Sequence, residues 1–161
     1  VLSYEEMNGY CNRAIKLNPN CKLTLILMQV NDIEDYMKNE GSGFVQDLLQ
    51  SVQDTVRRHV GHRGIVCPLQ PNLMSVVVQD INSDIKLRAF IESLRSRIAW
   101  NYRLVDPKYE ISFSFGVACY PENGMDMRIV HRKLVKALQM AQEKHANCYV
   151  IYKEHLHGEL S

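Results

Sequence analysis

The sequence predicts a mixed α/β (α+β) fold, in which a five-stranded sheet with a central β-hairpin is covered by helices on both faces. Three observations predict this fold. Helical and strand-like segments alternate along the chain, two β-branched runs flank a short turn between 64 and 80, and the first strand is apolar on both faces. The chain has 161 residues, 46% of them hydrophobic and 23% charged, which is typical of a globular domain with a buried core.

The first third of the chain predicts a helix, a strand and a second helix. A helix is expected over residues 3–17, and Asn18-Pro19-Asn20 ends it. A strand follows at 23–28, then a short polar helix over 32–38. Gly41-Ser42-Gly43 is expected to break the chain before the next helix.

The middle of the chain predicts two long helices on either side of the hairpin. Apolar residues at helical spacing predict a helix over 44–60. The hairpin is expected over 63–79, with Pro71 and Asn72 supplying the turn. The next helix runs from about 84 to 100.

The last third predicts a strand, a helix and a strand. Apolar and polar residues alternate from Ile111 to Phe115, which predicts a strand over 111–119 with Phe113 and Phe115 on one face. A helix is expected over 127–144 and a final strand over 148–152. Residues 1–161 are therefore interpreted as one domain, excised from a longer multidomain protein.

Composition excludes several classes of function. The 19 basic and 18 acidic side chains give a net charge of +1, so nothing favours nucleic acid or an anionic membrane as a partner. No apolar run approaches the roughly 20 residues of a membrane helix, and a cytoplasmic location is expected. Free thiols in a reducing compartment are expected for all five cysteines, which are Cys11, Cys21, Cys67, Cys119 and Cys148.

A basic cluster precedes the hairpin and has two interpretations. It consists of Arg57, Arg58, His59, His62 and Arg63. It could contact a phosphate or an acidic partner. The alternative is a solvated helix end, where cations interact favourably with the helix dipole.

Four segments, spread over nearly the whole chain, resemble the diguanylate cyclase module called the GGDEF domain. They are Met7-Asn8-Gly9-Tyr10-Cys11-Asn12-Arg13; the strand at 23–28 with the later Gly41 and Leu49; Ser112–Ala118 with Tyr120-Pro121; and Ala137-Leu138 with Ala141 and Asn147. The resemblance implies the palm-like fold of nucleotidyl cyclases and a role in bacterial cyclic di-GMP signalling.

The resemblance places the family's Gly-Gly-Asp/Glu-Glu-Phe motif on Gln70-Pro71-Asn72-Leu73-Met74, at the predicted hairpin tip. In the family, the two glycines let the backbone approach the GTP phosphates. Gln70 and Pro71 allow this approach less well, and Pro71 also has no backbone N–H to donate. The family's first acid binds Mg²⁺, and the neutral Asn72 is a poor substitute for it. The next acid is associated with catalysis, and Leu73 can neither ligate a metal nor move a proton.

The other functional positions of the family are replaced as well. They comprise a second metal carboxylate, two guanine-contacting groups, two phosphate-contacting cations, and the Arg and Asp of an inhibitory site. In that order, this sequence holds Gln29; Met37 and Gln46; Gln142 and Ala146; and Gly61 and Gly64. A register slip that brings Asn31, Asp32 or Asp35 into the site is an alternative, although the hairpin tip offers no second acid.

These replacements imply a degenerate, non-catalytic GGDEF domain that serves as a regulatory or protein-interaction module and needs no cofactor or metal. The alternatives are a nucleotide sensor that binds GTP or cyclic di-GMP without turnover, an active diguanylate cyclase variant, and a plain spacer. The expected partner is another protein or a neighbouring domain of the same chain, for which the family suggests the EAL type. A homodimer is also consistent with the resemblance.

Overall fold

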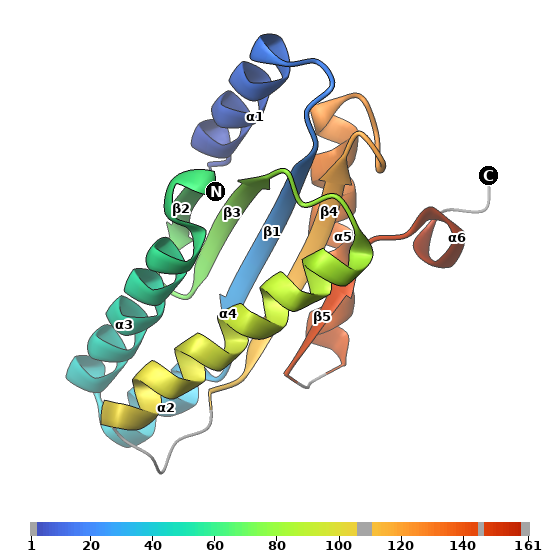
Figure 1. The fold of residues 1–161 in the computed structure, drawn as a ribbon. Helices are drawn as coiled ribbons and strands as arrows, with labels where there is room; N and C mark the ends of the chain where they lie inside the picture. The colour runs from blue at the N-terminus through green and yellow to red at the C-terminus, as the bar shows by residue number, and fades with distance from the viewer. Residues whose placement is uncertain (1–2, 106–110, 145–146, 159–161) are drawn as a thin grey trace.

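Five strands form one mixed sheet in the computed structural model, which describes residues 3–105, 111–144 and 147–158 (Figure 1). The strands are β1 (Leu23–Val30), β2 (Gly64–Gln70), β3 (Leu73–Gln79), β4 (Phe113–Tyr120) and β5 (Cys148–Ile151). They lie in the order β2-β3-β1-β4-β5, and only the β4–β5 pair is parallel. The predicted fold class is confirmed.

Helices cover both faces of the sheet (Figure 1). They are α1 (Glu5–Leu17), α2 (Ile33–Glu40), α3 (Ser42–Val60), α4 (Asp84–Val105), α5 (Met127–Glu143) and α6 (Glu154–His157), with a 3₁₀ turn η1 (Gly61–Arg63) after α3. One hydrophobic core lies between the sheet and α3 and α4. A second core lies between the opposite face and α1 and α5.

The sequence of strand β1 is apolar on both faces because the strand lies between the two cores. Ile26 and Met28 belong to the core under α3 and α4, whereas Leu25 and Leu27 belong to the core under α1 and α5. Successive side chains of a strand point to opposite faces, so a central strand covered on both sides is apolar throughout.

The hairpin lies nearer the edge of the sheet than the sequence predicts. β1 pairs with both β3 and β4 and takes the central position, so β3 is internal and β2 is the edge strand. Pro68 suits this edge because it has no N–H to donate, and the register shifts between Pro68 and Gln70. The turn itself is as predicted, with Gln70 opposite Leu73 across Pro71 and Asn72.

Strand β4 confirms the alternation seen in the sequence. Phe113 and Phe115 are both buried in the same core, with ring centroids 5.9 Å apart. Gly116 lets α5 approach the strand closely, because a Cβ atom there would lie 2.3 Å from the backbone nitrogen of Leu138. The helix and the strand therefore pack backbone against backbone.

Two local expectations differ from the structure. The break predicted at 41–43 is confined to Gly41, which has φ +89°, and α3 already begins at Ser42. Gly43 is tolerated inside the first helical turn. The described part of β4 begins at Phe113, two residues later than the predicted strand.

The cysteines are free, as expected, and three of them are buried. Burial raises the pKa of the Cys11 thiol to about 12, which keeps it protonated. None of the described helices is both long and apolar enough to cross a bilayer.

Candidate functional site

A pocket of about 700 Å³ opens at the end of the sheet where β1 finishes and the β2–β3 turn projects. Four positions that the resemblance assigns to metal or nucleotide binding line it, namely Gln29, Met37, Asn72 and Gln142. Pro71 of the turn lines it as well. The fold therefore brings together residues that are more than 100 positions apart in the sequence.

Two neutral amides face each other in this pocket. Gln29 lies near the end of β1, Gln142 lies in the last turn of α5, and Gln142 Nε2 donates a hydrogen bond to Gln29 Oε1. The resemblance predicts a carboxylate and a phosphate-binding cation at these positions. Here both positions hold neutral side chains that contact each other.

Asn72 is fixed to the end of β1 by two hydrogen bonds. The backbone N–H of Val30 donates to the Asn72 carbonyl at 2.9 Å, and Asn72 Nδ2 donates to the Val30 carbonyl at 3.3 Å. The Asn72 side chain thus presents an N–H donor, and not an oxygen, to the Val30 carbonyl. This geometry is unfavourable for Mg²⁺, which prefers oxygen ligands from every side.

Asn31 forms the floor of the pocket together with two serines that the sequence-based assignment of site residues missed. Its Nδ2 donates to Ser112 Oγ at 3.0 Å and to Ser114 Oγ at 3.1 Å, and Ser114 Oγ donates back to Asn31 Oδ1 at 3.2 Å. The alternating Ser-Phe-Ser segment was the only indication of this contact. These hydrogen bonds hold the Asn31 side chain against the start of β4.

The wall formed by α2 contributes the charges of the pocket. Asp32, Glu34 and Asp35 line it and are exposed, whereas no Lys or Arg is among the described lining residues. The described ranges also contain no group of three His, Cys, Asp or Glu side chains arranged to hold a metal ion. The neutral amides of Gln29 and Asn72 do not supply the carboxylate ligands that fit a bound Mg²⁺, and the exposed carboxylates make the field in the pocket unfavourable for a triphosphate.

The remaining residues of the hairpin tip serve the two cores and a second groove. Leu73 is 7% exposed and belongs to the core under α1 and α5, while Met74 is 4% exposed and belongs to the opposite core. Gln70 lies with Gln46 in a neighbouring groove of about 590 Å³. Gln46 and Met37 therefore line different cavities, and the two guanine-contacting positions do not converge. Ala146 lies outside the described residues.

The two glycines at the inhibitory-site positions have structural roles here. Gly61 ends α3 with φ +57°, and its N–H donates to the Arg57 carbonyl. A Cβ atom on Gly64 would lie 1.8 Å from the Val77 carbonyl oxygen, so no side chain fits without moving β3. The backbone geometry thus excludes an aspartate at this position.

Comparison with known proteins identifies the family. The family model described as "Diguanylate cyclase, GGDEF domain" matches residues 5–148. An uncharacterized protein from Synechocystis sp. is 17% identical over 142 residues, which make up 88% of this chain and 20% of the relative. The chain therefore spans about a fifth of the length of that curated relative.

Solved GGDEF domains share the fold at low identity. The active GGEEF domain of a diguanylate cyclase from Vibrio cholerae superposes with a TM-score of 0.75 at 16% identity, covering 90% of each chain. The GGDEF domain of DgcB from Caulobacter crescentus, solved in complex with c-di-GMP, gives 0.72 at 12% identity and covers 91% of this chain and 86% of its own. An EAL/GGDEF domain protein from M. capsulatus gives 0.66 at 15% identity, with 92% and 97% covered.

These structural similarities establish the fold, and the match over residues 5–148 establishes the family. The chain belongs to the diguanylate cyclase GGDEF domain family.

Proposed function

We propose that this GGDEF domain makes no cyclic di-GMP and acts as a regulatory or protein-interaction module. The hydrogen bond between Gln29 and Gln142 carries the proposal. It joins neutral side chains at the two positions where the family has a metal carboxylate and a phosphate-binding cation. The contact between Asn72 and Val30 supports the same conclusion at the hairpin tip.

The chemistry of the family explains why these replacements matter. Phosphoryl transfer between two GTP molecules depends on carboxylate-held metal ions that neutralise the charge developing on the phosphates, a contribution of several kcal/mol. Here both metal-ligand positions are amides, and Leu73 is a buried core residue at the position of the catalytic acid. No described Lys or Arg lines the pocket to compensate.

The proposal is tested by incubating the purified protein with GTP and either Mg²⁺ or Mn²⁺ and separating the products by chromatography. An active diguanylate cyclase assayed in parallel shows that the conditions support synthesis. We expect no cyclic di-GMP above the enzyme-free blank. Synthesis that disappears in the Asp32→Ala or Asp35→Ala variant would show that an α2 carboxylate holds the metal, and it would overturn the proposal.

A nucleotide sensor is the second candidate, and the open pocket of about 700 Å³ is the observation that favours it. Such a sensor would bind GTP or cyclic di-GMP without turnover. The acidic α2 wall and the absence of a described cation in the lining argue for weak binding. Calorimetry separates this candidate from the first.

The partner proposed for the module is another protein, a second copy of the chain, or a neighbouring domain. The structure from M. capsulatus is described as an EAL/GGDEF domain protein, which supports an EAL-type neighbour as one form of this proposal. Sequencing the flanking regions of the gene tests it directly.

A further inference from the structure

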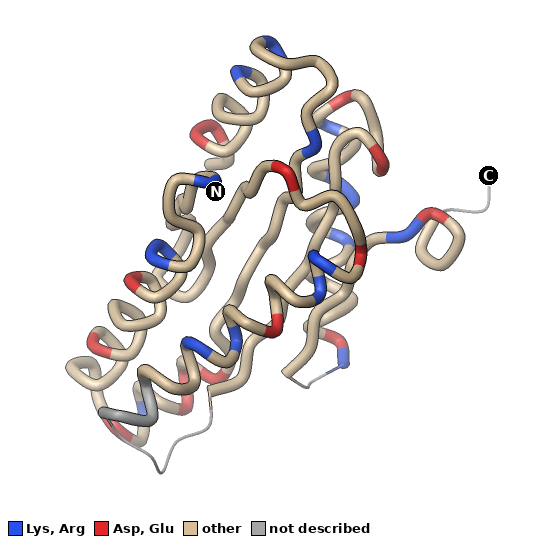
Figure 2. The backbone as a smooth tube through the Cα atoms, viewed as in Figure 1, with Lys and Arg blue, Asp and Glu red and all other residues tan. Residues whose placement is uncertain are grey.

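A basic groove lies between α3 and α4, on the face of the sheet covered by these two helices. We call it the α3–α4 groove; it has a volume of about 480 Å³ and is lined by Thr55, Arg58, Ser93, Ser96, Arg97, Trp100 and Asn101. Figure 2 shows basic positions on both helices. None of these residues lines the candidate nucleotide pocket or occupies a family position considered above.

A buried threonine organises the groove. Thr55 Oγ1 donates to the Ser51 carbonyl at 2.8 Å and accepts from Asn101 Nδ2 at 3.0 Å and from Arg58 Nη2 at 3.4 Å. Thr55 is 2% exposed, so this hydroxyl ties α4 to α3 beneath the groove. Arg58 is thereby oriented before any partner binds, which lowers the entropy cost of using it.

The other guanidinium group of the groove, that of Arg97, has no partner among the described residues. Arg97 makes no hydrogen bond or ion pair within the described part of the chain, and no carboxylate lines the groove. The acids nearest along the two helices are engaged elsewhere, because Asp54 accepts from Gln50 and Glu92 pairs with Arg95. Two unneutralised positive charges therefore share one groove.

The basic cluster predicted from the sequence divides into two parts in the structure. Arg57 donates to a backbone carbonyl of β2, and Arg63 donates to two backbone carbonyls at the end of α3. These contacts agree with the interpretation of the cluster as a helix end. Burial lowers the pKa of His59, the hydrogen bond with the Phe90 carbonyl opposes this shift, and the nearby cations Arg97 and Arg63 add to it. Only Arg58 of the cluster lines the groove.

An exposed aromatic side chain lies beside these charges. Trp100 is the only tryptophan in the chain, and it is 61% exposed on α4. Tryptophan and arginine are the residue types most enriched among energetically dominant interface residues. Their combination in a shallow groove suits a protein segment better than a small buried ligand.

We propose that the α3–α4 groove docks an acidic segment of a partner protein, with carboxylates on Arg58 and Arg97 and an apolar side chain on Trp100. Guanidinium groups bind carboxylates in bidentate geometry, and the unpaired charges of the groove complement a negative segment. The net charge of only +1 disfavours an extended polyanion such as nucleic acid. This inference rests on the proposed role as an interaction module and names the chemistry of the partner.

Trp100 reports occupancy of the groove without a label, because no other tryptophan contributes to the fluorescence. The probe is a short synthetic peptide that alternates glutamate pairs with leucine, and its control replaces every glutamate by glutamine. The full chain should show a saturable change in fluorescence with the acidic peptide only. Raising the salt concentration from low to physiological should weaken the binding, since exposed charges are screened.

The variants Arg97→Ala and Arg58→Ala should each weaken acidic-peptide binding by at least about fivefold. The matched control is Arg132→Ala, which removes one equally exposed arginine from α5 on the other face of the sheet. Equal binding by all three variants, or no saturable change, would overturn the inference. Saturation by inorganic phosphate in place of the peptide would also overturn it and assign the groove to a phosphate ligand.

Failure of this inference can be distinguished from failure of the proposed function. The fluorescence titration reads only the α3–α4 groove, and the cyclic di-GMP assay reads only the pocket at the end of β1. Peptide binding together with synthesis would refute catalytic inactivity alone. If neither peptide binding nor cyclic di-GMP synthesis is observed, only the inference about the α3–α4 groove is refuted.

Discussion

Gln142 on α5 donates a hydrogen bond to Gln29 on β1, so two neutral amides meet where related domains are expected to hold opposite charges. Both side chains are half-buried and line the pocket of about 700 Å³. The contact therefore joins two side chains that carry no charge. It is the observation that carries the proposal of a non-catalytic domain.

Restoring the charges at these two positions should reveal their coupling. Gln29→Asp alone should destabilise the protein, because the new carboxylate lies near the acids of α2. Adding Gln142→Lys should recover more stability than the sum of the single effects, by about 0.5–1 kcal/mol for a partly exposed pair. Urea unfolding at low and high salt measures this coupling.

The matched control for that cycle combines Gln142→Lys with Gln46→Asp. Gln46 is exposed in a different groove, so its effect should simply add to that of the lysine. Strict additivity in the Gln29→Asp pair as well would contradict the proximity of Gln29 and Gln142.

Gly64 should not accept the aspartate that the family's inhibitory site requires. Its Cβ would lie 1.8 Å from the Val77 carbonyl oxygen, so Gly64→Asp must push β2 away from β3. We expect a loss of at least about 2 kcal/mol in the free energy of unfolding, as for other overpacked sites. Thermal or urea unfolding measures it.

Gly43→Asp provides the control for this substitution. A Cβ atom at Gly43 meets nothing within 4 Å, and an acid in the first turn of α3 interacts favourably with the helix dipole. This variant should change stability by less than about 1 kcal/mol. If the Gly64→Asp protein is as stable as the Gly43→Asp protein, β2 and β3 separate at little cost, and the expected steric conflict at Gly64 is contradicted.

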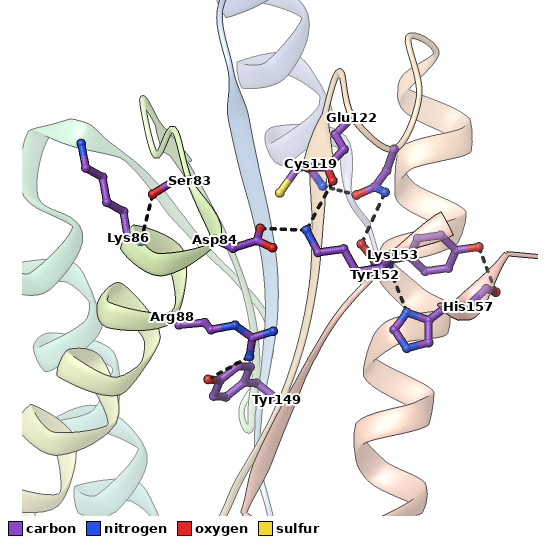
Figure 3. Close-up of polar contacts among 11 residues, drawn as sticks. Ser83, Asp84, Lys86, Arg88, Cys119, Glu122, Tyr149, Tyr152, Lys153 and His157 are labelled. Atoms are coloured by element: carbon purple, nitrogen blue, oxygen red, sulfur yellow. Dashed lines mark hydrogen bonds and ion pairs between the residues drawn. The ribbon is translucent and has the colours of Figure 1, made fainter. Parts of the chain in front are cut away.

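The C-terminal helix α6 should loosen in mild acid. His157 Nδ1 accepts a hydrogen bond from the backbone N–H of Lys153 at 2.9 Å, which requires a neutral ring (Figure 3). Burial lowers the pKa of His157, and Lys144, Lys136 and His155 lower it further. The undocked segment therefore binds a proton more readily than the docked one, so docking is fully stable above about pH 6.5 and weakens as the pH falls below it.

Hydrogen exchange at the Lys153 amide measures this effect. Relative to its value above neutrality, protection should fall in mild acid, after correction for the intrinsic rate. The pH dependence should disappear in His157→Gln but persist in His155→Gln, because His155 is exposed and no hydrogen bond joins its ring to another described residue. The ion pairs of Lys153 with Asp84 and Glu122 hold the same segment to α4 and the β4–α5 turn and should be unaffected (Figure 3). Equal protection of Lys153 in acid and at neutral pH would contradict a role for neutral His157.

Local patterns in the sequence were sufficient to predict most elements of the fold. The alternation around Phe113 and Phe115 predicted β4, and the uniformly apolar run at 23–28 predicted a strand covered on both faces. The position of the hairpin could not be predicted in this way. Strand order depends on which distant strand pairs with β1, and that choice leaves no trace in the spacing of residues within the hairpin.

The candidate site was predicted in part. The resemblance identified Gln29, Asn72 and Gln142, which the structure brings to one pocket. The hydrogen bonds of Gln29 with Gln142 and of Asn72 with Val30 depend on side-chain geometry across several elements, which the spacing of residues in the sequence does not specify. The α3–α4 groove was missed for the same reason, because Arg58 and Arg97 become neighbours only when the two helices pack.

A calorimetric titration of the protein with GTP in excess Mg²⁺ tests the central claim most directly. The pocket presents paired amides and exposed α2 carboxylates to a ligand with about four negative charges, and each unmatched polar contact costs about 1–3 kcal/mol. We predict no saturable binding below about 100 µM GTP, a concentration that corresponds to about −5.5 kcal/mol. An isotherm with low-micromolar affinity would contradict the account and make the domain a nucleotide sensor.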